Sequence, residues 1–471
     1  MSREKMKTLI LAILIIMSIV FTQKIWFYSP IKMLQSEASF KEKQTAKITE
    51  IRNELVIPER VEVSFGNSYY TIISSDVEKV WEASRSILFQ YFTADVEVVP
   101  TTLERYKENS WLKSVELEFG RNIPSVLVAS VFDTVDNKIV NNIKEIRKIL
   151  IPTLNRGVIY IVGKDNNVFE VRMENYQEDR QLLSFLDKLQ DSSYIRYYPL
   201  FIDVGNPTLM PLSYDVAIPE IFVESEIDVK DESMVTEKVK SFFDDSLDFV
   251  KTIKETSGAT VFMYGYGEKG VRINNRGRLE YNEEVRSISS SNVVNALDVA
   301  IEFVLQQEGG FPEGAYLKEI RQVNKGYYLG FNYRIDGLPV VFHTNNMTHP
   351  IEIEVYGNKV KSYRTFTRKK MNFPDVPINS KILLPQQIIE EHIDLLKYNY
   401  LKDQDVEEPK SDKEVLSYIE RSITKTEVLY YDTIEEASTQ LLVPVWRIKI
   451  DAREYYFNTY DGKLLYSSLV N

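Results

Sequence analysis

The feature that most constrains this chain is an apolar segment close to its N-terminus. Residues 9–21 are apolar except for Ser18, and after a polar pair at 23–24 the apolar character resumes as far as Tyr28. From Thr8 to Tyr28, about 21 residues at ~1.5 Å each give a helix of ~31 Å, which matches the thickness of a hydrocarbon core. The segment predicts a single transmembrane helix.

The flanks of this segment predict its orientation. Arg3, Lys5 and Lys7 make the head basic, and basic flanks stay on the cytoplasmic side. Trp26 and Tyr28 lie at the other end, where aromatic rings anchor a helix in the membrane interface. We therefore expect a single-pass protein of the cell membrane, with a cytoplasmic N-terminus and the bulk of the chain extracytoplasmic.

A cleaved secretory signal is the alternative interpretation of the same segment, because its strictly apolar part is only about 13 residues long. Residues 21–24, however, read Phe-Thr-Gln-Lys and lack the small residues of a cleavage site. We expect an uncleaved signal anchor. Both interpretations export the bulk of the chain.

One face of the anchor carries small polar residues. Ser18 and Thr22 are four residues apart and therefore share a helical face. Small residues at this spacing let two membrane helices approach closely and exchange hydroxyl hydrogen bonds. Ser18 and Thr22 are thus the predicted helix–helix interface, although weakly polar residues are also tolerated in a span without any partner.

Composition excludes several kinds of chemistry. The chain has no cysteine and only three histidines among 471 residues. Disulfide frameworks, thiolate metal sites and thiol nucleophiles are therefore excluded. With 57 Lys and Arg against 69 Asp and Glu, the net charge is −12. An acidic chain without a clustered basic stretch argues against nucleic acid as a partner.

Alternating strand patterns interspersed with amphipathic helices predict an α+β fold, with helices packed on mainly antiparallel sheets. The expected organisation is a multi-domain extracytoplasmic region behind one transmembrane helix. The expected boundaries are 1–28 for the head and anchor, 29–60 for a juxtamembrane stalk, 61–212 for an N-terminal α+β domain, 213–375 for a central α+β domain, and 376–471 for a C-terminal α+β domain.

The C-terminal half contains a repeated pattern. A helix over 292–307 precedes an alternating strand that ends at Asp336, a tight turn and a second strand. A helix over 385–397 precedes the same arrangement, in which the alternating strand ends at Asp451. The pattern predicts two similar helix-on-sheet modules, spanning roughly 291–370 and 380–471.

The residue types that carry catalysis or bind metals form no convincing pattern. His343 and His349 lack a third ligand at helical or hairpin spacing, and His392 reads as a polar surface residue of a helix. Asp244, Asp245 and Asp248 lack the glycine and distal glutamate of a calcium loop.

Two loops are explained structurally as well. Residues 289–292 read as a helix N-cap, and the glycine-rich loop 265–270 as a hairpin turn. The sequence leaves open whether the chain has paired carboxylates for glycoside hydrolysis, because it does not give the distance between them. We expect no catalytic, cofactor-binding or metal-binding residues.

Several segments spread over the chain resemble one family of proteins. They are Ile25-Trp-Phe-Tyr28-Ser-Pro, Val63-Ser-Phe-Gly followed by Tyr69-Tyr, the segment Tyr264–Tyr281, the strand pair Tyr327–Phe342, and the tail Val443-Pro-Val-Trp-Arg with Tyr456-Phe-Asn and Asp461-Gly. Together they resemble the YycH family, and the tail is similar to the terminal module that YycH shares with its relative YycI. The segment 376–471 is therefore expected to be a YycI-like domain.

The resemblance implies a function that the residues alone do not give. YycH proteins are membrane-tethered accessory proteins of Gram-positive bacteria that modulate WalK, the sensor kinase of the WalK/WalR two-component system in cell-wall homeostasis. The resemblance implies that the anchor helix contacts the transmembrane helices of a WalK-like kinase and that the extracytoplasmic part associates with a YycI-like protein. It implies no enzymatic activity, no cofactor and no small-molecule substrate.

The alternative is an anchored extracytoplasmic enzyme or a protein that binds a cell-wall polymer. An enzyme should have a deep cleft lined by convergent acids or by His343, with shifted pKa values. A regulator should have no such cleft and should instead present an exposed patch or an unpaired sheet edge.

Overall fold

The computed structural model describes Leu14, Met17, Ser18 and residues 43–178, 180–192, 194–285, 292–344, 347–373, 381–403, 411–434 and 439–469. The chain divides into two compact units, Met1–Asn53 and Glu54–Asn471. In the first unit, residues 43–53 are helical, which agrees with a partly helical stalk. The second unit contains the three sheets described below.

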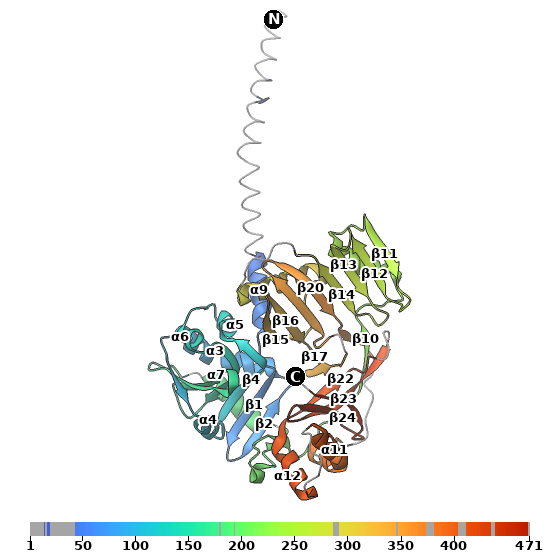
Figure 1. Cartoon of the computed structure of the whole chain (residues 1–471). Helices are drawn as coiled ribbons and strands as arrows, with labels where there is room; N and C mark the ends of the chain where they lie inside the picture. Colours follow the sequence, from blue (N-terminus) through green and yellow to red (C-terminus); the bar gives the residue numbers. More distant parts are fainter. Residues whose placement is uncertain are drawn as a thin grey trace, which may run out of the picture. The chain divides into compact units, whose positions relative to one another are not determined.

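The first sheet is made by residues 60–211 and is antiparallel throughout (Figure 1). Its strands lie in the order β3-β7-β6-β5-β4-β1-β2-β8-β9. Their bounds are β1 Arg60–Gly66, β2 Tyr69–Ile73, β3 Glu97–Thr101, β4 Ser114–Pro124, β5 Glu145–Pro152, β6 Val158–Val162, β7 Val168–Arg172, β8 Tyr197–Tyr198 and β9 Met210–Pro211. The helices of this region are α3 Val77–Thr93, α4 Leu103–Ser110, α5 Ser125–Ser130, α6 Lys138–Asn142 and α7 Arg180–Asp191.

Helix α3 shows how the sequence pattern becomes packing. Val80, Trp81 and Leu88 lie on one face of the helix at helical spacing and are buried. Trp81 meets Phe119 of β4 edge to face, with ring centroids 6.2 Å apart. Asp76, directly before the helix, does not cap it with its side chain: its carboxylate pairs with Lys79 at 2.8 Å, and only its carbonyl accepts helical hydrogen bonds.

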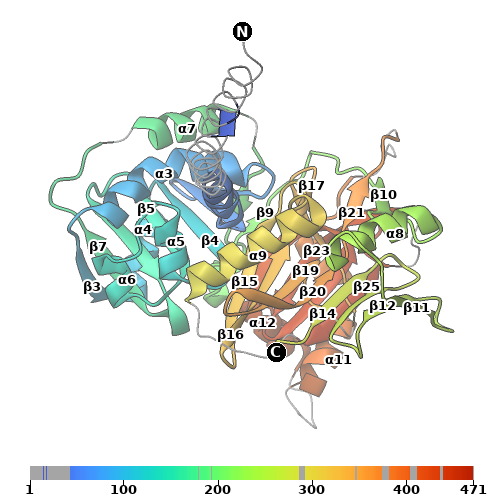
Figure 2. The same ribbon diagram turned by 90° about the horizontal axis from the view of Figure 1, so that it is seen from above.

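The second sheet comes from residues 250–365 and is also antiparallel, with the order β11-β12-β13-β14-β20-β19-β16-β15. Its strands are β11 Val250–Lys254, β12 Thr260–Tyr264, β13 Lys269–Ile273, β14 Leu279–Glu283, β15 Tyr316–Val323, β16 Gly326–Asn332, β19 Ile351–Tyr356 and β20 Lys359–Thr365. Helix α9, Val293–Glu308, packs against β16, β19 and β20, as Figure 2 shows from above. Helix α8, Glu232–Lys240, is followed by a short 3-10 turn, Ser241–Phe243, which contacts α9.

The third sheet joins the central and C-terminal parts of the chain. Its order is β17-β18-β22-β23-β10-β21, and β24 and β25 continue it from β23. The strands are β10 Ile221–Ser225, β17 Arg334–Ile335, β18 Leu338–Val341, β21 Arg368–Lys370, β22 Ile423–Tyr431, β23 Thr439–Ile450, β24 Arg453–Asn458 and β25 Leu464–Leu469. Helices α10 Pro385–Glu391, α11 Ile393–Asp403 and α12 Asp412–Ser422 precede β22. The expected α+β class with mainly antiparallel sheets is confirmed, since β18 and β22 form the one parallel pair among the described strands.

The repeated pattern corresponds to two similar arrangements. Helix α9 is followed by a four-stranded antiparallel meander, β15-β16-β19-β20, and the helices before β22 are followed by β22-β23-β24-β25. Asp336 and Asp451 both adopt a positive φ of 49°, in the turns where the pattern placed them. The two arrangements differ in the strand that follows the first turn. Strand β18 lies outside the meander β15-β16-β19-β20 and pairs with β22 of the other arrangement.

The two loops singled out in the sequence are confirmed as structural. Residues 264–269 connect the antiparallel strands β12 and β13, so the glycine-rich loop is a hairpin turn. Asn292 caps α9, where its side chain accepts a hydrogen bond from the backbone N–H of Asn295 at 2.8 Å. Ser289, Ser290 and Ser291 lie outside the described residues.

Candidate functional site

The predicted anchor is described only in part. Ser18 is helical and exposed, whereas Thr22, Trp26 and Tyr28 lie outside the described residues. In the described part of the chain, no helix has both the length and the apolarity needed to cross a membrane. The anchor, its Ser18–Thr22 face and its interfacial aromatic residues therefore stay predictions.

His343 and His349 line one cavity, which is described below, whereas His392 packs against the last hairpin. His349 is buried, and its ring nitrogens lie 2.9 Å from Asn332 Oδ1 and 3.0 Å from Glu319 Oε2. His392 was predicted as a polar surface residue, but it is half-buried. Its Nε2 lies 2.8 Å from the carbonyl oxygen of Gly462, because the helix end packs on the last hairpin.

His343 sits among tyrosines. Its ring stacks on Tyr466 with centroids 4.0 Å apart and meets Tyr456 at 4.7 Å. Burial lowers the pKa of His343 to about 4, so the ring is neutral at ordinary pH. Its Nδ1 has no hydrogen-bond partner among the described residues.

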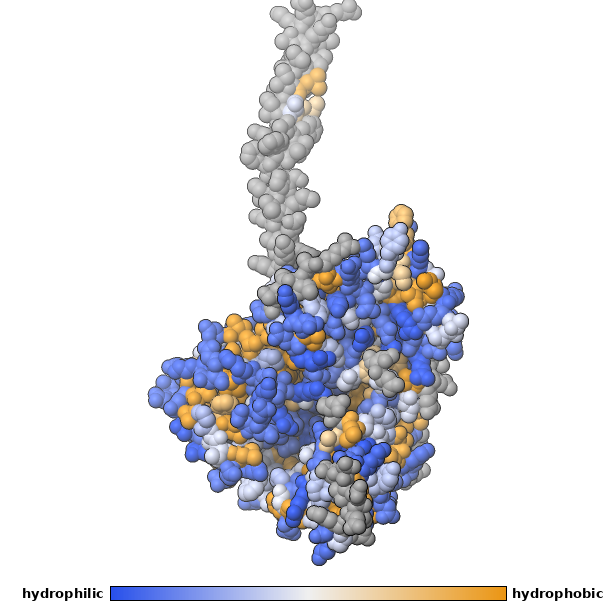
Figure 3. Space-filling view, in the orientation of Figure 1, coloured by the Kyte–Doolittle hydropathy of each residue, from blue (hydrophilic) through white to orange (hydrophobic). Residues whose placement is uncertain are grey.

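The largest polar feature, which the sequence did not predict, lies where the three sheets meet. Strands β4 and β15 lie against each other there, and β22 and β23 complete the junction. Figure 3 shows this face hollowed and lined by hydrophilic residues. Two neighbouring cavities occupy the hollow, and they share Glu118, Arg147, Thr424 and Lys425 as lining residues. We call the two together the junction cleft.

The polar side chains of the junction cleft, most of them charged, come from alternate positions on strands. Each strand contributes a pair two residues apart, which places both side chains on one face of its sheet. The pairs are Arg60 and Glu62 on β1, Glu116 and Glu118 on β4, Lys425 and Glu427 on β22, Arg447 and Lys449 on β23, and Glu454 and Tyr456 on β24. The opposite faces of these strands carry apolar residues that pack in the core.

The first cavity has a volume of about 470 Å³ and gathers three carboxylates. Glu62, Glu116 and Glu118 offer oxygens that all lie within 4.8 Å of one another. Such spacing suits a divalent cation, yet basic residues already balance the site. Arg60 lies 2.5 Å from Glu62, and Lys148 pairs with Glu116 and lies 3.8 Å from Glu118.

The electrostatics of these carboxylates differ. Burial raises the pKa of Glu62, and Arg60 does not offset it because the neighbouring carboxylates add to the effect. Burial acts in the same direction on Glu118, but the charges of Lys148 and Lys425 outweigh it and lower the pKa of Glu118 to about 2. One cavity therefore holds an ionised carboxylate next to one that takes up a proton more readily.

The second cavity has a volume of about 720 Å³, and most of the charged residues that line it are cations. The basic lining residues are Arg121, Arg147, Lys318, Lys425, Arg447 and Lys449, whereas the acidic ones are Glu118 and Glu454. Burial lowers the pKa of Lys318 to about 8 and also lowers the pKa values of Lys425 and Lys449, since neighbouring cations add to the burial effect in each case.

A single glutamate behind this cavity connects the three sheets. Glu59, whose side chain is 3% exposed, lies 2.5 Å from Lys318 of β15, 3.7 Å from Lys425 of β22 and 3.6 Å from Arg447 of β23. Burial alone would raise the pKa of Glu59, but these three cations hold it well below its usual range. Glu427 pairs with Arg447 and lies 3.3 Å from Lys425.

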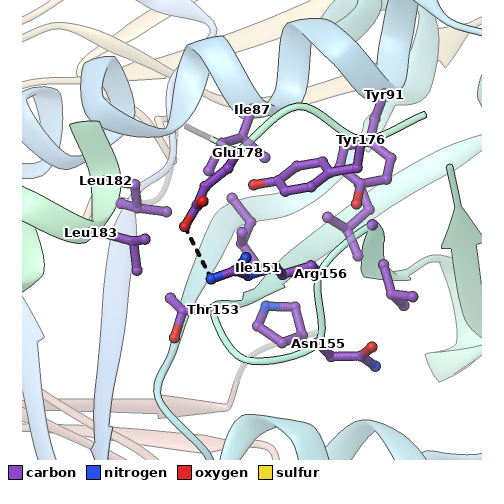
Figure 4. Close-up of a pocket in the computed structure, with 14 residues that line it drawn as sticks. Ile87, Tyr91, Ile151, Thr153, Asn155, Arg156, Tyr176, Glu178, Leu182 and Leu183 are labelled. Atoms are coloured by element: carbon purple, nitrogen blue, oxygen red, sulfur yellow. Dashed lines mark ion pairs between the residues drawn. The ribbon is translucent and has the colours of Figure 1, made fainter. Parts of the chain in front are cut away.

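A much smaller cavity lies beside α3 in the first sheet region (Figure 4). Its volume of about 20 Å³ accommodates about one water molecule. The ion pair of Arg156 and Glu178, at 3.1 Å, closes one side of it. This cavity is too small for an organic ligand.

The second feature relevant to binding is the outer strand of the second sheet. Strand β11 pairs with β12, and no described strand pairs with its other edge (Figure 1). Phe249, directly before it, is 90% exposed and has a positive φ of 65°, a costly conformation for a bulky residue. Tyr266 in the β12–β13 turn is fully exposed, and Ile253 on β11 is 47% exposed. We call β11 with these three side chains the β11 edge.

Comparison with known proteins identifies the N-terminal region. Residues 4–189 match the family described as YycH protein, N-terminal domain. No curated protein matches the sequence. The crystal structure of YycH from Bacillus subtilis shares the fold with a TM-score of 0.54 at 15% identity, over 88% of this chain and 95% of that one.

Two other solved structures are less similar. An uncharacterized protein from Eubacterium rectale matches with a TM-score of 0.34 at 11% identity, over 53% of this chain and 86% of that one. The C-terminal domain of YpeB from Bacillus megaterium matches with a TM-score of 0.25 at 11% identity, over 51% of this chain and 97% of that one.

These findings define an α+β protein of antiparallel sheets whose N-terminal domain is that of the YycH proteins. The match supports the predicted resemblance to the YycH family over residues 4–189.

Proposed function

We propose that this protein is a single-pass, extracytoplasmic regulator of a WalK-like sensor histidine kinase in cell-wall homeostasis, and that it acts through protein–protein contacts. The match to the YycH N-terminal domain carries this proposal, because it extends from residue 4 to residue 189 and so includes the predicted anchor together with most of the first sheet. An anchor and a folded domain that belong to one family pattern are expected to work together.

Within this proposal the membrane contact is made by the anchor helix. Ser18 and Thr22 form its narrowest face, and Trp26 and Tyr28 hold its outer end in the interface. Lipid provides no hydrophobic driving force for helix association, so close packing at small residues has to supply it. The C-terminal segment 376–471 is the YycI-like module of the proposal.

The extracytoplasmic contact is assigned to the β11 edge, with a YycI-like protein as the partner. An open strand edge offers backbone donors and acceptors to another strand. Exposed aromatic side chains beside it supply the apolar anchors that such interfaces use. Phe249 supports this assignment, because its strained backbone and exposed ring give the isolated chain no packing benefit.

The topology is testable with single cysteines, because the natural chain has none. Ser2→Cys places a thiol in the basic head, and Ser213→Cys places one at an exposed position of the second unit. A membrane-impermeant maleimide added to intact cells should label the Ser213→Cys variant and should label the Ser2→Cys variant only after lysis. Labelling of Ser2→Cys in intact cells, or protection of Ser213→Cys, would refute the proposed orientation.

One observation favours the alternative of an extracytoplasmic enzyme. Carboxylates with oppositely shifted pKa values, Glu62 and Glu118, share one cavity, and such pairs serve as acid and base in glycoside hydrolases. Both are already engaged by cations of the protein, which favours a structural ion network. Release of reducing ends from purified cell-wall polymer, lost in Glu118→Gln, would instead establish the enzyme.

A further inference from the structure

We propose that the cationic cavity of the junction cleft binds an anionic ligand that carries two or more phosphate or carboxylate groups. This inference goes beyond the proposed regulatory function, and it rests on geometry that is independent of any kinase. The relevant observations are the balance of charges around the cavity, the burial of those charges, and the shape of the cavity.

The charge balance leaves cations without carboxylate partners. Glu59 and Glu427 are shared by three cations, Lys318, Lys425 and Arg447. Two carboxylates therefore neutralise three positive charges. Arg121 also lines the cavity, but it is paired with Glu319 at 3.0 Å and therefore contributes little to the excess of positive charge.

Two further cations line the same cavity. In the described part of the chain, neither Arg147 nor Lys449 has a carboxylate within ion-pair distance; Arg147 donates a hydrogen bond to Asn166 Oδ1 at 3.1 Å. Glu454 on β24 is a third carboxylate of this site, and its charge offsets part of the charge of Arg447 and Lys449. Glu118 acts on Lys425 but also lies 3.8 Å from Lys148 of the neighbouring cavity. Together with Glu59 and Glu427, Glu454 makes three carboxylates that face five cations. The cavity therefore presents an excess of positive charge to any ligand that enters it.

Burial makes this excess effective. The side chains of Lys318, Lys425 and Arg447 are only 12–16% exposed, so solvent screens them weakly. The Nε of Arg447 has no hydrogen-bond acceptor among the described residues, although the guanidinium is in an ion pair. Burial lowers the pKa values of Lys318, Lys425 and Lys449, and repulsion between the neighbouring cations adds to this effect. An anion placed between them relieves that repulsion.

The shape of the cavity limits the size of the ligand. A volume of about 720 Å³ lies within the usual range of sites for small molecules, roughly 300–1,000 Å³. One wall is aromatic, formed by His343, Tyr456 and Tyr466, and it offers flat apolar surface for the body of a ligand. The guanidinium and ammonium groups that line the same cavity provide the charge-assisted hydrogen bonds that phosphate and carboxylate oxygens accept.

The direct test is calorimetric titration of the full-length chain in detergent micelles, at low ionic strength, with tripolyphosphate, citrate and orthophosphate as probes. Tripolyphosphate presents several phosphates, citrate presents several carboxylates, and orthophosphate presents one anionic group. The proposal predicts saturable binding with one ligand per chain for tripolyphosphate, citrate or both, and binding at least about tenfold weaker for orthophosphate, because it cannot reach several cations at once. The multivalent probe that binds more tightly identifies the anionic group that the site prefers.

The key variants are Arg147→Gln and Lys449→Gln, because neither removes an ion pair from the described structure. Each should weaken the binding of the preferred probe at least about fivefold while the thermal unfolding midpoint is kept. Arg276→Gln and Lys463→Gln remove equally basic but exposed residues outside both cavities and should leave affinity unchanged.

Ser468→Asp provides a second variant should either glutamine variant unfold. It adds a carboxylate to the lining of the cavity and should weaken the binding of the preferred probe as well. Absence of saturable binding by every probe would overturn the proposal. Equal weakening in the Arg276→Gln and Lys463→Gln controls would do the same, because binding would then be a general surface effect. Neither outcome bears on the kinase, whose regulation is measured separately.

Discussion

The carboxylate of Glu59 lies 2.5 Å from the ammonium group of Lys318, although Glu59 directly precedes the first strand of one sheet and Lys318 lies on an outer strand of another. The same carboxylate faces Lys425 and Arg447 of the third sheet. A residue near the beginning of the folded unit thus connects all three sheets through charge, in a place where apolar packing is replaced by an ion network.

Replacing Glu59 by Gln should therefore destabilise the protein strongly. The variant leaves Lys318 without its ion-pair partner and leaves Lys425 and Arg447 with Glu427 alone, and breaking a buried ion network typically costs about 3–5 kcal/mol. Chemical denaturation monitored by tryptophan fluorescence measures the loss. The matched control is Glu232→Gln, whose pair with Lys254 is largely exposed, so its loss should change stability little. Equal, small effects of both changes would contradict the role assigned to Glu59.

Glu118 should make stability depend on pH in the acid range. Its pKa is about 2 in the folded protein, whereas an unperturbed glutamate has a pKa of 4.5. Between these values the unfolded chain binds the extra proton, so stability contributed by Glu118 is fully present above pH 4.5 and is lost as the pH falls toward 2.

The loss from Glu118 should amount to at most about 3 kcal/mol. Comparing the thermal unfolding midpoint of the natural protein and of Glu118→Gln between pH 6 and pH 3 tests this expectation. The variant should be less stable at pH 6 and should lose less stability on acidification. Parallel curves for the two proteins would exclude Glu118 as the source.

Periodicity in the sequence indicates some of the strands that carry these charges, such as β4, where Val115–Phe119 alternates, and the strand that ends at Asp451. Strands β15 and β22 were not predicted, and periodicity does not give the direction in which the charges point. Alternation indicates that Glu116 and Glu118 share a face. Whether that face meets water or a buried cavity depends on β15 and β22, which lie far away in the chain.

Local signals were also misleading at the edges of elements. Residues 55–60, expected at the end of a stalk, are buried, because they enter the first sheet next to β4. Strand β5 was not predicted, since Glu145–Lys148 mixes charged and apolar residues, yet it lies between β4 and β6. Paired charges two residues apart on several predicted strands were the available signal for the junction cleft.

The β11 edge should contribute to partner binding but not to folding. Phe249→Asn removes an exposed ring and places at this position a residue that tolerates a positive φ, so stability should be unchanged or slightly higher. Combined with Tyr266→Ser, it should reduce co-purification of a YycI-like partner at least about fivefold. Tyr398→Ser, on the exposed side of α11, is the control. Undiminished co-purification of the double variant would place the contact elsewhere.

The anchor makes a prediction of its own. Ser18→Leu together with Thr22→Leu keeps the segment apolar but fills the narrow face, and association with a WalK-like kinase should weaken by about 1–2 kcal/mol. Ala12→Leu serves as the control, because Ala12 lies about 120° away from Ser18 around the helix. Crosslinking of the full-length pair in membranes gives the readout. Unchanged crosslinking would show that this face is exposed to lipid.

The central claim is that the protein regulates the kinase. The most direct measurement is the autophosphorylation rate of a WalK-like kinase reconstituted in vesicles, with and without saturating amounts of the full-length chain. The account predicts a change of several-fold in one direction, which the Ser18→Leu, Thr22→Leu variant reduces. An unchanged rate, with both proteins correctly inserted in the same vesicles, would contradict it.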